Sequence, residues 1–311
     1  MTGQLTAIVV NWNAGDGLAE SVASIQNSTI DATVVVVDNE SSDGSIENLG
    51  ATYPSVRVVQ TGENLGYGRG ANAGIETVES DYVVVMNPDV FLDREALAKM
   101  VAYLESHPAV GVVGPCLKDA AGHPLATCGL RPRLSDAICR KLLLHLVLPF
   151  FRFRRVRPVE STEVDWVTGA CMVGRREAFA AVDGFDKAIF MYFEDVDLCL
   201  RLKTAGWSVH YVVEAIGRHI GGHSSAQAFD HMLIASDRSY RYFTAKHFGL
   251  LSARVLSLMT PLELFLRSLG WVLASVLPSK RPAARSRFRA YWKLLFENLS
   301  QSPDRFRGSV S

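Results

Sequence analysis

The chain has 311 residues, of which 48% are hydrophobic, and its formal net charge is zero. This length suits one large domain with an appendage, or two small domains, and the composition allows a sizeable core. Its five cysteines are scattered and form no Cys-x-x-Cys pair, which argues against a zinc site or a redox motif and favours reduced core thiols in a cytosolic protein.

Short β-branched runs alternate with helical patterns over residues 5–115. Strands are predicted at residues 5–10, 32–37, 56–60, 81–86 and 110–113, and helices at residues 18–26, 45–53, 68–78 and 94–107. Strands that alternate with helices imply a mainly parallel, twisted sheet flanked by helices, so the predicted fold class is α/β.

This alternation breaks at residues 116–165 and returns over residues 166–223. Three further helices are predicted at residues 229–248, 251–277 and 283–299, with prolines at their ends and within the second one. We therefore expect a first domain over residues 1–225, with halves at 1–115 and 116–225, and a basic helical extension over residues 226–311.

Acidic and amide side chains follow three separate elements of the predicted sheet. Asp38 follows the second strand, Asn87 and Asp89 follow the fourth, and Glu194 and Asp195 follow a later apolar run. Open α/β sheets bind ligands at the carboxyl ends of their strands. Carboxylate oxygens at such an edge suit a divalent cation, which can in turn hold a diphosphate.

Asp38 lies in a turn-rich stretch, so it is either a turn residue or a group that recognises a nucleotide base or ribose. An acid after the second strand also occurs in Rossmann folds, which need a glycine-rich turn after the first strand. Here that turn is Val10-Asn11-Trp12, and the glycines that begin with Gly66 follow the third strand instead. A dinucleotide oxidoreductase is therefore disfavoured.

The segment from Asn64 to Asn72 opens a predicted helix and holds three glycines. Glycines let a backbone approach a ligand closely, and the N-terminus of a helix favours phosphate. The alternative is a tight loop followed by a helix that packs closely through its glycines.

Glu194 and Asp195 start a predicted helix, so they are either N-terminal capping residues or a general base and its neighbour. Two adjacent acids repel each other, which tends to hold one proton nearer neutral pH. His219 and His223 flank a glycine-rich stretch, where one imidazole could bind a metal ion, although a lone histidine is more often structural.

Taken in order, these motifs resemble glycosyltransferase family 2, the inverting, nucleotide-sugar-dependent enzymes of GT-A fold. The resemblance covers residues 5 to about 225. It rests on the segments at residues 9–13, 37–39, 64–72, 87–90, 166–170, 184–186, 190–198 and 219–224. The segments at 87–90 and 190–198 look most like the bacterial rhamnosyltransferase branch, and the chain is similar to actinobacterial enzymes that add L-rhamnose to polyprenyl-diphosphate-linked N-acetylglucosamine.

The resemblance implies a role for each matching residue. The donor site would be lined by Val10, Asn11, Trp12, Asp38, Gly66, Asn72, Asn87 and Asp89, with Asp38 at the base of the nucleotide. Asp89 and His219 would hold Mg²⁺ or Mn²⁺, and Asn87 replaces the first acid of the family's Asp-x-Asp motif. Asp195 would be the catalytic base with Glu194 beside it, and Trp166 and Gly169 would border the acceptor.

The function implied by the resemblance is inverting transfer of a sugar, L-rhamnose from dTDP-L-rhamnose, to a polyprenyl-diphosphate-linked saccharide in cell-wall or surface-polysaccharide synthesis. The same fold with a UDP-hexose donor is one alternative. A non-catalytic protein that binds sugar nucleotides or glycans is another, and the combination of Asp89, Asp195 and His219 argues against it.

Basic residues gather in two segments with apolar neighbours. Residues 131–160 hold eight basic and two acidic residues, and residues 241–311 hold twelve and three. Because Leu and Phe accompany cations such as Lys141 and Arg152, we expect an anionic membrane surface rather than nucleic acid as the partner.

These segments would place the enzyme peripherally on the cytoplasmic face of the cell membrane. An interface of a homo-oligomer, or a helical cap on the sheet, is the alternative. No signal peptide is expected before the first strand. The longest candidate for a transmembrane helix, the uncharged run at residues 268–278, has eleven residues, which is too short to span a bilayer.

Overall fold

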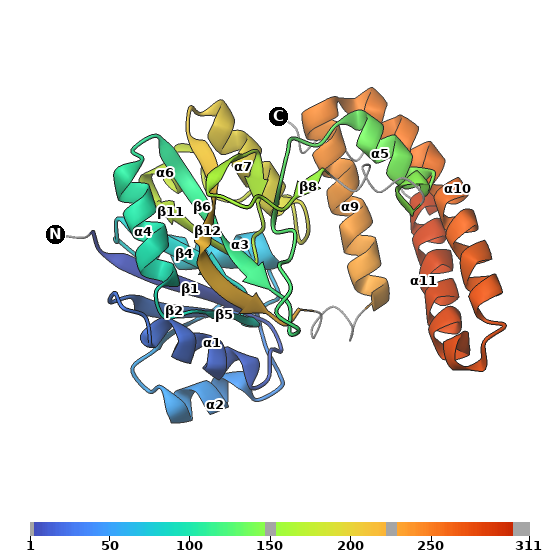
Figure 1. Cartoon of the computed structure of the whole chain (residues 1–311). Coiled ribbons are helices and arrows are strands. Elements are labelled where there is room, and N and C mark those ends of the chain that lie inside the picture. Colours follow the sequence, from blue (N-terminus) through green and yellow to red (C-terminus); the bar gives the residue numbers. More distant parts are fainter. Residues whose placement is uncertain (1–2, 147–153, 222–228, 301–311) are drawn as a thin grey trace. The chain divides into compact units, whose positions relative to one another are not determined.

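The computed structural model describes residues 3–146, 154–221 and 229–300, and its path is shown in Figure 1. The chain forms two compact units. One unit comprises residues 1–131, 155–190 and 194–224, and the other comprises residues 132–154, 191–193 and 225–311. We call them the sheet unit and the helical unit.

The sheet unit alternates strands and helices through most of its length. Its strands are β1 (Leu5–Asn11), β2 (Thr33–Asp38), β3 (Arg57–Gln60), β4 (Tyr82–Met86), β5 (Val90–Leu92), β6 (Val110–Lys118), β7 (Cys128–Gly129), β8 (Arg155–Val156), β9 (Thr162–Val164), β10 (Trp166–Val167), β11 (Cys171–Arg175) and β12 (Ser208–His219). Its helices are α1 (Gly17–Gln26), α2 (Ser45–Thr52), α3 (Tyr67–Ile75), α4 (Ala96–Ser106), α6 (Arg176–Ala181) and α7 (Glu194–Thr204).

Within the described residues, the main sheet has the order β3-β2-β1-β4-β11-β6-β12-β5, and β9 pairs with β12. Strands β1 to β4 are parallel to one another. Beyond them β11 runs antiparallel to both β4 and β6. Strands β7, β8 and β10 form a separate small sheet.

Helices cover both faces of the main sheet (Figure 1). Ala7 and Val9 of β1 share a core with Leu18 of α1 and Met100 of α4. Ile8, whose side chain points to the opposite face, meets Gly74 of α3. The buried β-branched runs of β1, β2 and β4 are typical of parallel strands that are covered on both sides.

The helical unit consists of α5 (Leu134–Lys141), α9 (Phe229–Phe248), α10 (Leu250–Ala274) and α11 (Arg281–Ser300), with the short turns η1 (Leu144–Leu146) and η3 (Pro278–Lys280). Its long helices meet through a core formed by Ile234, Leu264, Tyr291 and Leu294. A second core joins Ala137, Tyr240 and Leu256. Every one of these helices therefore has a buried face and an exposed one.

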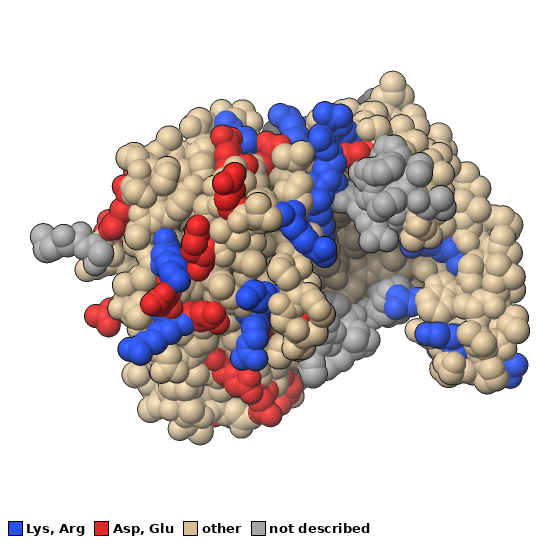
Figure 2. Space-filling model, viewed as in Figure 1, with Lys and Arg blue, Asp and Glu red and all other residues tan. Residues whose placement is uncertain are grey.

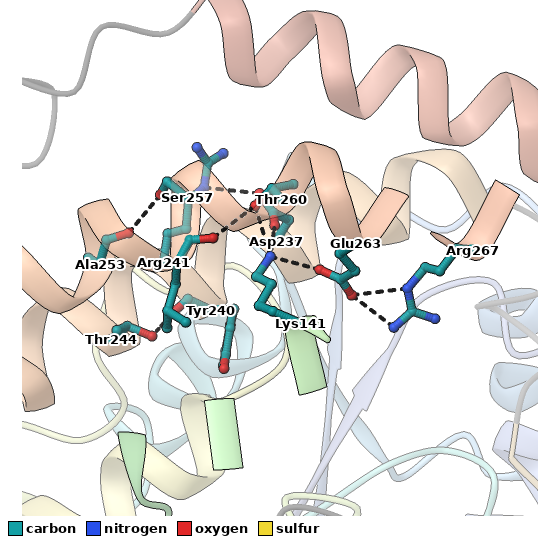
Figure 3. Close-up of polar contacts among 11 residues, drawn as sticks. Lys141, Asp237, Tyr240, Arg241, Thr244, Ala253, Ser257, Thr260, Glu263 and Arg267 are labelled. Carbon is teal, nitrogen blue, oxygen red and sulfur yellow. Dashed lines mark hydrogen bonds and ion pairs between the residues drawn. The ribbon is translucent and has the colours of Figure 1, made fainter. Parts of the chain in front are cut away.

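Lys141 lies at the centre of a buried polar cluster in the helical unit, which Figure 3 shows in detail. Its Nζ lies 2.8 Å from Oε2 of Glu263 and 3.6 Å from Oδ1 of Asp237. Arg267 pairs with Glu263 at 2.8 Å and Arg241 with Asp237 at 3.0 Å. The Lys141 side chain is 3% exposed, so the expectation that it meets lipid phosphates is wrong.

The predicted α/β class, with a mainly parallel sheet and C-terminal helices, is confirmed. The short strands β5 and β7 to β10 were not predicted, because two or three residues carry too little periodicity to stand out. Among the described residues one helix, α10, passes a test of length and apolar composition for crossing a membrane. This helix is longer than the uncharged run at residues 268–278 because it also includes Arg254, Glu263 and Arg267.

Candidate active site

Asn11 and Asp38 lie side by side where β1 and β2 end. Nδ2 of Asn11 donates to Oδ1 of Asp38 at 3.0 Å and to the hydroxyls of Ser41 and Ser45. Asp38 is 2% exposed and also accepts the backbone N–H of Ser41. In this conformation its carboxylate orders the loop after β2, as a turn residue does, and its contact with a nucleotide base stays a prediction.

The other donor-site residues of β1 differ in their access to solvent. Val10 is 5% exposed and lies against Gly70 of α3, so its side chain belongs to the core. Trp12 follows β1 and is partly exposed. A ligand at this edge therefore has more access to Trp12 than to Val10.

Gly66 and Asn72 hold the first turns of α3 against a neighbouring loop. Gly66 has a φ of +80°, and a Cβ there would collide with the Phe190 carbonyl oxygen. Nδ2 of Asn72 donates to the Phe185 carbonyl and its Oδ1 accepts the Phe185 N–H, both at 2.8 Å. The N–H of Tyr67 donates to the Phe190 carbonyl. The interpretation as a packed loop accounts for these contacts, and donor binding by Gly66 and Asn72 stays a prediction.

The segment after β4 brings Asp89 next to His219. Strand β12 pairs with β5 so that His219 is opposite Val90, and Oδ1 of Asp89 lies 3.3 Å from Nε2 of His219. Asn87 precedes them, and its backbone N–H donates to the Ala170 carbonyl at 2.9 Å. Residues 130 positions apart in the chain thus meet at one edge of the sheet, whereas His223 lies outside the described residues.

This pair fits a divalent cation. Oδ1 of Asp89 is buried and has no hydrogen-bond donor among the described residues, and both side chains are about a quarter exposed. Two ligands of one ion lie about 3 Å apart, as these two atoms do. The described residues contain no cluster of three or more His, Cys, Asp or Glu side chains. Mg²⁺-type sites commonly use one or two protein ligands and complete the shell with substrate phosphates and water.

Glu194 and Asp195 begin α7 in different environments. Oδ2 of Asp195 accepts the Gly169 N–H at 2.8 Å, its Oδ1 accepts the Val196 N–H, and the residue is partly exposed. Glu194 is 6% exposed, and its Oε2 has no hydrogen-bond partner among the described residues. Burial and the neighbouring Asp195 raise the pKa of Glu194 to about 8.

Burial raises the pKa of Asp195 as well, but the two N–H donors and the charge of Arg155 oppose that rise. We therefore place the negative charge of the pair on Asp195 and the shared proton on Glu194. The charged member, Asp195, is also the more exposed of the two residues. Such an arrangement can accept a proton from a bound hydroxyl group.

Tyr67 is linked to Asp195 through Gly169, and sequence reasoning missed it. Its hydroxyl donates to the Gly169 carbonyl in a short hydrogen bond, and the N–H of the same Gly169 holds Asp195. Burial raises the pKa of Tyr67, and the charges of Glu194, Asp195 and Asp89 raise it further. The buried phenol is therefore close enough to all three carboxylates for their charges to act on it. The Tyr that follows Gly66 in the glycine-rich segment was a signal that could have pointed to it.

Of the two predicted acceptor residues, only Gly169 contacts the acidic pair. The Trp166 ring is 3% exposed, and its N–H donates to the Leu130 carbonyl at 3.1 Å. Arg155 lies over this ring at 5.8 Å. Trp166 thus supports the segment that leads to Gly169, and direct contact of its ring with an acceptor stays a prediction.

The backbone immediately before Glu194 is strained. Tyr192 and Phe193 have φ values of +67° and +69°, a region that bulky side chains rarely adopt. Strain of this kind collects at functional sites, where the surrounding structure maintains it. Nothing in the local sequence indicates this conformation, because neither residue is Gly or Asn.

Comparisons with known proteins agree with this geometry. The profile described as "Glycosyltransferase like family 2" matches residues 3–234. The chain is 32% identical to the N-acetylglucosaminyl-diphospho-decaprenol L-rhamnosyltransferase of Mycobacterium tuberculosis, over 80% of this chain and 87% of that protein. It is 27% identical to the rhamnosyltransferase WbbL of Escherichia coli, over 71% of this chain and 85% of that protein.

Among solved structures, the mannosyltransferase PcManGT from Pyrobaculum calidifontis, in complex with GDP-Man and Mn²⁺, is similar in fold. Its TM-score is 0.54 at 17% identity, over 96% of this chain and 88% of that chain.

Proposed function

Since this chain belongs to glycosyltransferase family 2, we propose that it transfers L-rhamnose from dTDP-L-rhamnose to a saccharide carried on a polyprenyl diphosphate. The sugar and the acceptor are those in the names of its mycobacterial relative. The observation that supports catalysis in this chain is the environment of the acidic pair, in which a charged, partly exposed Asp195 lies beside a buried Glu194. A protein that only bound glycans would have no need to keep these two carboxylates together.

In this proposal Asp195 takes the proton of the acceptor hydroxyl. The acceptor oxygen forms a bond with the anomeric carbon, and the bond from that carbon to the nucleotide diphosphate breaks on the opposite face, so the configuration inverts. The electron pair leaves with the diphosphate. Gly169 holds Asp195 in position through its N–H, and Tyr67 in turn holds the Gly169 peptide.

Asp89 and His219 would hold a divalent cation, Mg²⁺ or Mn²⁺, beside the diphosphate. Such a cation supplies Lewis-acid stabilisation of the leaving group when it is bound. The Asp89 oxygen without a hydrogen-bond donor supports this assignment. Loss of transfer in excess chelator, with recovery on addition of Mn²⁺, is the expected result, and full activity in chelator would contradict it.

We place the enzyme peripherally on the cytoplasmic face of the cell membrane, where a lipid-linked acceptor and a soluble nucleotide sugar would both be within reach. The function is tested with purified full-length chain, an N-acetylglucosamine diphosphate lipid and a panel of dTDP- and UDP-sugars, with the product identified by mass spectrometry. We expect a mass increase of one deoxyhexose with dTDP-L-rhamnose. Transfer from a UDP-hexose, and not from dTDP-L-rhamnose, would show that the proposed donor is wrong. Binding of a donor without transfer or hydrolysis would favour a non-catalytic binding protein.

A further inference from the structure

An unbroken row of exposed apolar side chains runs along one side of α10. Successive members are separated by three or four residues, the spacing of one helix face. The row consists of Leu251, Val255, Leu258, Leu262, Phe265, Leu269, Val272 and Val276, the last just beyond the helix end. Leu258 is 81% exposed and Phe265 is 64% exposed. Contiguous apolar surface of this kind marks an interaction site rather than an ordinary protein surface.

The opposite side of α10 is fixed inside the helical unit. Leu256 and Leu264 belong to its two cores, and Glu263 is bound to Lys141 and Arg267 (Figure 3). A helix that crossed a bilayer would have to carry this charged side into the hydrocarbon, which is costly. The length of α10 alone would permit a span, but its packing favours a position in which only the apolar row leaves water.

The described side chains of α10, η3 and α11 include exposed cations and no exposed acids. Among the described side chains of residues 250–296, the only carboxylate is that of Glu263, which is 6% exposed and paired. The exposed cations of this stretch are Arg254, Lys280, Arg281, Arg285, Arg289 and Lys293. Figure 2 shows this as uncharged surface with scattered basic groups on α10 and α11, whereas acidic and basic groups mix over the visible face of the sheet unit.

Helix α11 repeats the pattern. Arg281, Arg285, Arg289, Trp292 and Phe296 follow one another at intervals of three or four residues and are exposed. The Trp292 and Phe296 rings are neighbours, with centroids 5.9 Å apart. Arginine and tryptophan on one helix face are typical of segments that lie at the boundary between lipid headgroups and acyl chains.

We propose that α10 lies along the surface of an anionic bilayer, with its apolar row among the acyl chains and the cations of α10, η3 and α11 at the lipid phosphates. This inference rests on the proposed function and names the surface that would bring the enzyme to a lipid-linked acceptor. A second copy of the chain is the competing occupant, because the spacing would also suit a coiled coil. Pro261 is exposed beside the row, and the flanking positions, which include Ser252, Met259 and Ser268, hold no acid to complement the exposed Arg254, so a coiled coil is disfavoured.

The test compares two variants of the full-length chain. Leu258→Gln, Phe265→Gln and Leu269→Gln remove the centre of the row. Leu130→Gln and Val159→Gln remove two exposed apolar side chains of the sheet unit. Flotation with vesicles of phosphatidylglycerol and phosphatidylcholine should show the vesicle partition coefficient of the first variant reduced by roughly tenfold or more. The second variant should bind as the wild type does, and high salt should weaken wild-type binding.

Three outcomes would overturn the proposal. The first is equal binding of the two variants to vesicles. The second is a wild-type dimer, detected by light scattering, that becomes a monomer in the first variant. The third is retention of the wild type on vesicles after alkaline carbonate washing, which would mean that α10 crosses the bilayer. Circular dichroism and the thermal shift caused by a dTDP-sugar with Mn²⁺ serve as controls for folding.

The same measurements separate this inference from the function. Vesicle binding without sugar transfer would support the membrane-binding surface and contradict the proposed rhamnosyltransferase activity. Transfer to a short-chain, water-soluble acceptor should be equal in the wild type and the first variant. We expect the first variant to lose transfer activity only when the acceptor is embedded in vesicles.

Discussion

Lys141→Met is the sharpest test of how the helical unit is held together. The substitution keeps the length of the side chain and removes its charge from a position that is 3% exposed. The side chains of Glu263 and Asp237, each 8% exposed, would lose their common partner, but each retains an arginine. Breaking a buried ion pair by removing one partner costs about 3–5 kcal/mol, and the remaining arginines place this case at the lower end.

The loss should appear in two measurements. At about 2–4 °C per kcal/mol, a destabilisation of about 3 kcal/mol lowers the melting temperature by roughly 6–12 °C. Hydrogen exchange followed by mass spectrometry should accelerate in α5 and α10, where Lys141 and Glu263 lie, because local opening becomes easier.

Lys203→Met is the matched control. Its Nζ contacts two carboxylates at 2.7 and 2.9 Å, but the side chain is 28% exposed, so its removal should cost up to about 1 kcal/mol. Equal decreases in melting temperature for the two substitutions would show that burial does not increase the contribution of the Lys141 ion pairs to stability. Adding Glu263→Gln to Lys141→Met should recover part of the lost stability, because it removes a buried carboxylate that has only Arg267 as its remaining partner.

Asp195→Asn should lower turnover by roughly 10²- to 10⁴-fold with donor binding unchanged, and turnover within about threefold of the wild type would exclude Asp195 as the base. Tyr67→Phe leaves the Gly169 carbonyl without its donor, at a cost of about 1–3 kcal/mol, and it should lower kcat and shift the pH profile without changing donor affinity. An unchanged profile would mean that Tyr67 only fills space. Because the pKa of Glu194 is raised from 4.5 to about 8 in the fold, its contribution to stability is fully present below about pH 4.5 and is lost progressively as the pH rises through about 8. Glu194→Gln should flatten the fall in melting temperature between about pH 5 and pH 8, and curves of equal slope would count against the buried, protonated Glu194.

Hydrophobic patterns that extend over whole helices and strands were sufficient to predict the main elements of the fold. The β-branched runs of β1, β2 and β4 and the helices of the C-terminal part lie within a few residues of their predicted positions. The pairing of Asp89 with His219 also follows from each lying at a strand end, although the antiparallel pairing of β12 with β5 that joins them was not predicted.

The environment of individual side chains could not be predicted in the same way. Lys141 has the sequence context of a residue that binds lipid, but its position is decided by carboxylates about 100 residues further along the chain. Asp38 and Asn72 satisfy their polar groups within the protein, a fact that depends on loops whose course no periodicity specifies. Tyr67 acquires its role from Gly169, which is 102 positions away.

The division of the chain into two units has a practical consequence for anyone who wishes to study the catalytic part alone. The polypeptide passes between the units at residues 131/132, 154/155, 190/191, 193/194 and 224/225. A chain shortened at residue 225 would therefore keep residues 132–154 and 191–193 and lose the helices with which they cluster. Phe193, whose ring lies 5.2 Å from that of Tyr240 and 5.4 Å from that of Phe243, would be exposed to water directly before Glu194. Because this residue also has a strained backbone that the native contacts maintain, such a truncation would disturb the acidic pair itself, and an inactive fragment would say nothing about the need for the helices in catalysis.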